Sequence, residues 1–92
     1  MLRFVWDRDK AAANLAKHGV SFNEAATAFG DPLSITIPDP DHSVGEERWL
    51  LLGLSTAGRL LVVAHTERGD EIRIITARPA TRRERHDHEE TR

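Results

Sequence analysis

The chain has 92 residues, with 13 lysines and arginines against 15 aspartates and glutamates, and its formal net charge at pH 7 is −2. Since so short a chain has room for one hydrophobic core, we predict a single domain over residues 1–92 and exclude a two-domain enzyme. The lack of cysteine excludes disulfides and cysteine-ligated zinc, and it indicates a reducing compartment. No apolar run approaches the ~20 residues that cross a bilayer, so we expect a cytoplasmic protein that contacts no membrane.

The first third of the chain predicts one strand and two helices. Large apolar side chains alternate over residues 2–6, as is typical of a short strand at or near a sheet edge. An alanine-rich helix is expected over residues 9–18, begun by an aspartate and ended by Gly19, because glycine adopts the left-handed conformation that closes helices. A capping box that starts at Ser21 begins a second helix, which ends before Pro32.

After Pro32 the apolar residues recur with a period of two, which predicts strands. Four strands are expected, over residues 33–37, 48–54, 59–66 and 72–78. Because short turns separate the last three, these strands are antiparallel neighbours. The polar residues 38–45 form the longest loop, and residues 82–92 form either a short C-terminal helix or a disordered tail.

This order of elements, β-α-α-β-β-β-β, predicts an α+β fold. In it, an antiparallel sheet carries the two N-terminal helices on one face. The runs Leu50-Leu51-Leu52 and Leu60-Leu61-Val62-Val63 are apolar on both sides of their strands, so the opposite face also needs cover. We expect the C-terminal tail or a partner protein to supply part of it.

Charge is unevenly distributed along the chain. Acidic residues outnumber basic ones over residues 1–47, and the reverse holds over residues 48–85, where every basic residue is an arginine. Arginine binds phosphate through a bidentate fork, so this segment is a candidate for contact with nucleic acid. A GC-rich genome also favours arginine, and charged residues are usually plain solvated surface, so composition does not establish a phosphate ligand.

The last predicted hairpin collects an imidazole, a carboxylate and several guanidinium groups, which are the groups that metal-free RNA cleavage requires. They belong to His65, Glu67, Arg68, Arg73 and Arg78. In this interpretation His65 is the general base or acid, and Glu67 is its partner or the alternative base. Arg68 and Arg78 stabilise the charge of the phosphorane, while Arg73 holds a substrate phosphate. We expect the hairpin to gather all five side chains in one pocket.

Ordinary structural roles account for the same residue types. Glu67 can belong to a solvated, self-paired turn, and His65 can close the end of a core strand. We assign Lys17 to substrate phosphates, although a lysine in the last turn of a helix also complements the helix dipole. The triplet His86-Asp87-His88 is more typical of solvent-exposed side chains than of a metal site. His42 lacks the carboxylate and base arrangement that a serine hydrolase requires. We therefore expect neither metal nor cofactor.

A series of short motifs runs from Phe4 to Arg85. They read Phe4-x-Trp6-Asp7-x-x-Lys10, Asn14, Lys17-His18-Gly19-Val20-Ser21-Phe22-x-Glu24-Ala25, Phe29-x-Asp31-Pro32, His42-Ser43, Glu46-Glu47-Arg48-Trp49, Gly53-x-Ser55, Gly58-Arg59-Leu60-Leu61-Val62-Val63-x-His65-Thr66-Glu67-Arg68 and Ile72-Arg73-Ile74-Ile75-x-Ala77-Arg78-x-Ala80-Thr81. Each motif alone is unspecific, but their order and spacing resemble the BrnT family, the toxin halves of bacterial type II toxin–antitoxin pairs.

The resemblance implies a RelE-like fold and a ribonuclease activity that blocks translation. It also implies neutralisation by a BrnA-type antitoxin that has its own DNA-binding domain. Two copies of each protein would form a complex that represses its own operon, so operator DNA would be contacted only through the antitoxin. The chain contains no tyrosine, which excludes proton transfer by a tyrosine phenol. His65 or Glu67 would have to take that role.

We therefore expect a metal-independent endoribonuclease that cleaves mRNA through a 2′,3′-cyclic phosphate. The alternative is a non-catalytic module whose arginine-rich sheet face docks an antitoxin helix and takes part in operon autoregulation. A repressor that binds DNA alone is disfavoured, because the net charge is negative and no predicted helix carries a row of basic side chains.

Overall fold

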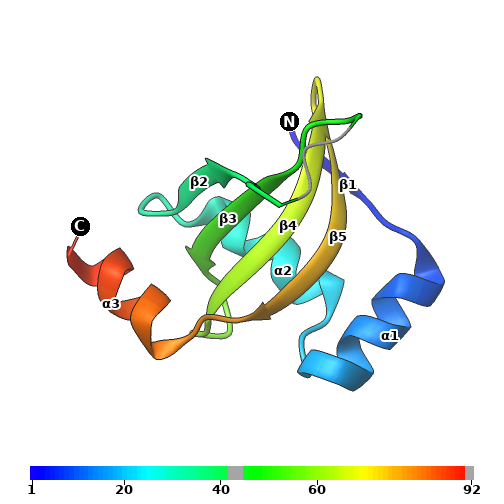
Figure 1. Ribbon diagram of the computed structural model, residues 1–92. Helices are drawn as coiled ribbons and strands as arrows, with labels where there is room; N and C mark the ends of the chain where they lie inside the picture. The colour runs from blue at the N-terminus through cyan, green and yellow to red at the C-terminus, as the bar shows by residue number, and fades with distance from the viewer. Residues whose placement is uncertain (42–44, 91–92) are drawn as a thin grey trace.

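The computed structural model describes residues 1–41 and 45–90 (Figure 1). The elements are β1 (Arg3–Val5), α1 (Arg8–His18), α2 (Phe22–Thr27), the short 3-10 helix η1 (Ala28–Gly30), β2 (Ile35–Pro38), β3 (Trp49–Leu54), β4 (Leu60–Arg68), β5 (Glu71–Pro79) and α3 (Arg82–Glu90). The predicted order is confirmed. Of the two alternatives for the tail, the helix forms over Arg82–Glu90. His42 and the centre of the predicted loop lie outside the described residues, as do residues 91 and 92.

The N-terminal helices begin and end where their capping residues predict. The side chain of Asp7 accepts a hydrogen bond from the backbone N–H of Lys10 at 2.9 Å and so begins α1. Gly19 ends α1 with a φ of 69° and donates its N–H to the Leu15 carbonyl at 2.9 Å. Ser21 caps α2 in the same way as Asp7 caps α1. None of the described helices is long and apolar enough to span a membrane.

The five strands form one sheet in the order β1-β5-β4-β3-β2. Strands β2 to β5 are antiparallel neighbours, as expected, but β1 pairs in parallel with β5 through Arg3↔Glu71, Phe4↔Ile72 and Val5↔Arg73. The sheet is therefore mixed rather than wholly antiparallel. The reason lies in the connection: α1 and α2 carry the chain across one face of the sheet, from the β1 edge to the β2 edge (Figure 1).

The hydrophobic core lies between this face of the sheet and the helical layer. Its buried members are Val20, Phe22, Ala25, Ala28, Leu51, Leu61, Val63, Ile72, Ile74 and Ala77. Aromatic side chains extend the core towards β1: Phe4 packs edge-on against Phe29 and Trp6 against Phe22, with ring centroids 5.1 and 6.0 Å apart. The sheet face next to the N-terminal helices is therefore closed.

Candidate nucleic-acid interface and catalytic face

A β-bulge interrupts the pairing of β5 at Ile75. Ala64 of β4 pairs with Thr76, and the next residue, His65, pairs with Ile74, so Ile75 has no partner across the ladder. A bulge of one residue reverses the alternation of side chains beyond it. Two residues of β5 that lie on opposite sides of Ile75, and whose residue numbers differ by an odd amount, therefore point to the same face of the sheet.

The bulge places Arg73 and Arg78 on the same face of the sheet. In a regular strand, residues five positions apart point to opposite faces. Here Arg73 lies opposite Thr66 and Arg78 lies opposite Val62, and these two residues of β4 share one face. Thr76 lies between the two arginines on that face.

Arg68 joins this set from the end of β4. We call the side chains Thr66, Arg68, Arg73, Thr76 and Arg78 the cationic face. It lies opposite the helix-covered core, because Thr66 and Arg68 alternate along β4 with His65, which is completely buried on the core side. Within the described part of the chain Arg73 makes no ion pair, whereas Arg68 and Arg78 are each paired with a glutamate.

His65 and Glu67 point to the other side of the sheet. His65 is completely buried, and its ring packs edge-on against Phe29 with centroids 4.8 Å apart. Its Nε2 lies 2.9 Å from Oε2 of Glu67, and its Nδ1 lies 3.2 Å from the Val63 carbonyl oxygen. The expectation that the hairpin gathers all five predicted side chains in one pocket is therefore wrong. Alternation along β4 separates His65 and Glu67 from Arg68, and the bulge keeps Arg73 and Arg78 on the side of Arg68.

A polar cavity of about 210 Å³ lies at the hairpin end of the cationic face. It is lined by Glu46, Thr66, Arg68, Glu71 and Arg73. Nε of Arg68 donates to Oε2 of Glu46 at 2.7 Å, which ties the segment before β3 to the end of β4. Thr66 is buried at the bottom of this end of the face, whereas the arginines are exposed.

At its other end the cationic face meets α3. Nη1 and Nη2 of Arg78 bind Oε1 and Oε2 of Glu84 at 2.8 and 2.9 Å, a bidentate pair. Glu84 is also part of the cap of α3: it accepts from the Thr81 N–H at 2.8 Å, and its own N–H donates to Oγ1 of Thr81 at 3.1 Å. The Arg78 guanidinium, followed by the Thr81 backbone, lowers the pKa of Glu84 from its ordinary value of 4.5 to about 2. The pKa of Arg78 is raised by the same pair.

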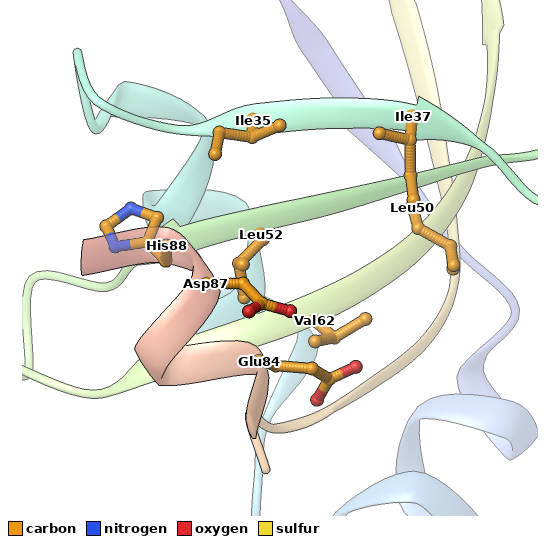
Figure 2. A pocket seen from close by; sticks show the side chains of 8 residues that line it. All are labelled: Ile35, Ile37, Leu50, Leu52, Val62, Glu84, Asp87 and His88. Carbon is orange, nitrogen blue, oxygen red and sulfur yellow. The ribbon is translucent and has the colours of Figure 1, made fainter. Parts of the chain in front are cut away.

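An apolar cavity of about 240 Å³ separates α3 from the sheet beside the cationic face (Figure 2). The strand residues that line it are Ile35, Ile37, Leu50, Leu52 and Val62, and α3 contributes Glu84, Asp87 and His88. The prediction that the C-terminal tail covers part of this face is confirmed. His88 is buried here, while His86 pairs with Glu90 at 3.1 Å on the exposed side of α3. Among the described residues no group of side chains is arranged to hold a metal ion.

Lys17 lies at the edge of the sheet, beside the bulge. A cavity of about 330 Å³ is lined by residues of α1, including Lys10, Asn14 and Lys17, and by Ile75 and Thr76 of β5. Lys17 is exposed there. It thus extends the cationic face around the free edge of β5, which is compatible with the predicted phosphate contact.

Sequence reasoning overlooked two carboxylates of this surface, Glu46 and Glu84. A signal for Glu84 was present, because Thr81-x-x-Glu84 is a capping-box pattern and places the glutamate in the first turn of a helix. Glu46 stands in the motif Glu46-Glu47-Arg48-Trp49, but nothing local shows that it meets Arg68, which lies 22 positions further along the chain. That several charged side chains share one face of the sheet follows from the bulge at Ile75 and could not be predicted without it.

Comparisons with known proteins agree with this architecture. The family model described as "Ribonuclease toxin, BrnT, of type II toxin-antitoxin system" matches residues 6–84. The 1.1 Å crystal structure of the Brucella abortus ribonuclease toxin BrnT matches with a TM-score of 0.68 at 20% sequence identity, over 89% of this chain and 100% of that one. At this identity the structural likeness establishes the fold. No curated protein sequence matches the chain. Because the family model matches most of its length, the chain belongs to the BrnT family of ribonuclease toxins of type II toxin–antitoxin systems.

Proposed function

We propose that the chain binds RNA on the cationic face and cleaves mRNA without a metal ion, so that translation stops. One observation carries the proposal: the bulge at Ile75 aligns Arg73 and Arg78 on a face that the N-terminal helices leave open. Their partners in β4 are four residues apart, which corresponds to about 13 Å along the strand at ~3.3 Å per residue. Two guanidinium groups at this separation can bind different phosphates of one RNA strand.

The reaction that fits this face is attack of a 2′-hydroxyl on the adjacent phosphate. A bond forms between O2′ and phosphorus, the bond from phosphorus to O5′ breaks, and the products carry a 2′,3′-cyclic phosphate and a 5′-hydroxyl. Negative charge builds up on the phosphorane oxygens, and fixed guanidinium groups stabilise it. We assign this stabilisation to Arg68 and Arg73, and to Arg78 once RNA competes with Glu84 for its guanidinium. Lys17 would hold a phosphate at the edge of the face.

In this proposal His65 is a positioning residue, although an imidazole is a common general base or acid. A general base must come within hydrogen-bond distance of the proton that it removes. His65 is completely buried against Phe29, so RNA on either face does not reach its ring. We propose that His65 positions Glu67 and the end of β4, and that proton transfer belongs to another group.

The sharpest test of the cationic face is Arg73→Ala, with Arg82→Ala on α3 as the matched control. Arg73 is exposed, so the substitution leaves the core intact. We expect cleavage of an mRNA substrate in the presence of EDTA to fall roughly 10²-fold, as for loss of one stabilising donor. The slope of log affinity against log salt for single-stranded RNA should decrease by about 0.7 for one lost phosphate contact.

The control should match the parent in both measurements. If Arg73→Ala also cleaves and binds like the parent at every salt concentration, RNA does not use this face. Cleavage that EDTA abolishes and Mg²⁺ restores would refute metal independence alone.

Membership of the family supports an antitoxin as partner, and we propose a BrnA-type antitoxin in a complex with two copies of each protein. Repression of the operon would then act through the antitoxin. The second candidate function, a non-catalytic module, is favoured by the apolar cavity beside α3, which a partner side chain can fill. Complex formation without cleavage by the free protein would support the module, and light scattering of the complex gives its stoichiometry.

A further inference from the structure

Three carboxylates border the cationic face in the described part of the chain. They differ in how many of their oxygens already accept a hydrogen bond. Glu84 gives both oxygens to Arg78 and one of them also to the cap of α3. Glu71 binds Nη2 of Arg3 at 2.8 Å, at the β1 edge of the sheet. Glu46 gives only Oε2, to Arg68, and among the described residues its Oε1 accepts no hydrogen bond. Glu46 and Glu71 therefore each keep one carboxylate oxygen that accepts no hydrogen bond from the described residues, and of the two only Glu46 is held by a guanidinium of the cationic face itself.

The surroundings of Glu46 suit a scissile phosphate. The cavity that it lines has a volume of about 210 Å³, roughly seven times the ~30 Å³ that a water molecule occupies in the liquid. It is thus large enough for a phosphate group and the adjoining ribose hydroxyl. Arg68 and Arg73 line the same cavity, so a phosphate bound there would meet two guanidinium groups beside the carboxylates of Glu46 and Glu71. Figure 1 shows the segment before β3 passing beside the β4–β5 hairpin, where the bond from Arg68 holds it.

We propose that Glu46 is the general base of the reaction and that Arg68 positions it. This inference rests on the proposed ribonuclease function. The proton of the 2′-hydroxyl passes to Oε1 of Glu46 while O2′ bonds to phosphorus. The leaving O5′ takes a proton from water, and Glu46 returns its proton to solvent, so the carboxylate is regenerated. The single bond from Arg68 fixes the orientation of the carboxylate and leaves Oε1 without a hydrogen bond from the described residues.

The test is Glu46→Gln, which keeps the shape of the side chain and its acceptor for Arg68 but removes the base. Glu47→Gln, at the exposed neighbouring position, is the matched control. We expect Glu46→Gln to lower the cleavage rate at saturating RNA by 10²- to 10⁴-fold, the usual contribution of a general base. Affinity for a substrate analogue with a 2′-deoxy nucleotide at the cleavage site should stay within about twofold of the parent.

Glu46→Asp keeps a carboxylate and should recover part of the lost rate, whereas a purely structural role would not distinguish it from Glu46→Gln. Wild-type cleavage by Glu46→Gln, or a parallel loss of RNA affinity and of thermal stability, overturns the inference. If the parent cleaves and Arg73→Ala does not, while Glu46→Gln is fully active, the cationic face stands and only the base is misassigned. If the parent itself cleaves no RNA, the proposed function fails first.

Discussion

Replacing Asn14 by leucine should destabilise the domain, because this side chain completes the hydrogen bonding of the free edge of β5. Strand β1 pairs with β5 only as far as Arg73. Beyond it, Nδ2 of Asn14 donates to the carbonyl oxygens of Ala77 at 2.8 Å and Val20 at 3.0 Å, and Oδ1 accepts from the Ala77 N–H at 3.1 Å. One amide on α1 thus replaces a neighbouring strand.

The expected loss of stability follows from the backbone groups that Asn14→Leu would leave without hydrogen-bond partners. Asn14 is 7% exposed, so Ala77 loses partners for its N–H and carbonyl, and Val20 loses one for its carbonyl, with little access for water. A buried polar group left without a partner costs ~1–3 kcal/mol, so three such groups suggest about 3–9 kcal/mol. A domain of this size has roughly 5–15 kcal/mol in all, so the variant should be close to unfolding.

Urea denaturation followed by circular dichroism measures this difference, with Asn23→Leu on the exposed side of α2 as the control. The control should change the free energy of unfolding by less than about 0.5 kcal/mol. Since Ala77 stands between Thr76 and Arg78, Asn14→Leu should also reduce RNA affinity of the fraction that remains folded. A loss below about 1 kcal/mol would show that water or a shifted β1 replaces the amide, and that Asn14 does not hold the edge.

Two further predictions concern packing and pH. Gly53→Ala would bring a Cβ atom within 2.7 Å of the Ala28 carbonyl oxygen, so it should cost ~1–3 kcal/mol in urea denaturation, whereas Gly30→Ala, where the Cβ has open space, should not. The pKa of Glu84 is lowered from 4.5 to about 2, so its ion pair stabilises the fold above pH 4.5 and loses this effect as the pH falls towards 2. The difference in unfolding free energy between the parent and Glu84→Gln should shrink over that window, while Glu89→Gln should show no such trend.

Local signals account for the part of the fold that could be predicted. The first turn of α1, its end at Gly19 and the start of α2 depend on side chains within four residues of the backbone groups that they cap. The parallel pairing of β1 with β5 has no such signal. It joins Arg3 to Glu71 across most of the chain, and the strand that fills this edge is decided by the path of the two helices.

The residues of the hairpin that carry charge could be predicted from the sequence, but the faces of the sheet to which their side chains point could not all be predicted. Alternation along β4 correctly placed His65 on the face of Leu61 and Val63, and alternation before the bulge correctly placed Arg73 away from Ile74. The bulge itself has no signal in the sequence around Ile75, because a regular strand over the same residues also buries Ile74. Without it, Arg73 and Arg78 would point to opposite faces.

The position of His65 follows from the same alternation, and it bears on the mechanism. A residue that shares a face with two core positions of one strand lies under whatever covers those positions, and here that cover includes Phe29. An imidazole in such a place can bind Glu67 and the Val63 carbonyl but cannot be reached by RNA. For this reason the proposed function assigns the chemistry of cleavage to the uncovered face. On that face β4 and β5 offer guanidinium groups, hydroxyls and the carboxylate of Glu71, and the segment before β3 adds Glu46, the base that we propose.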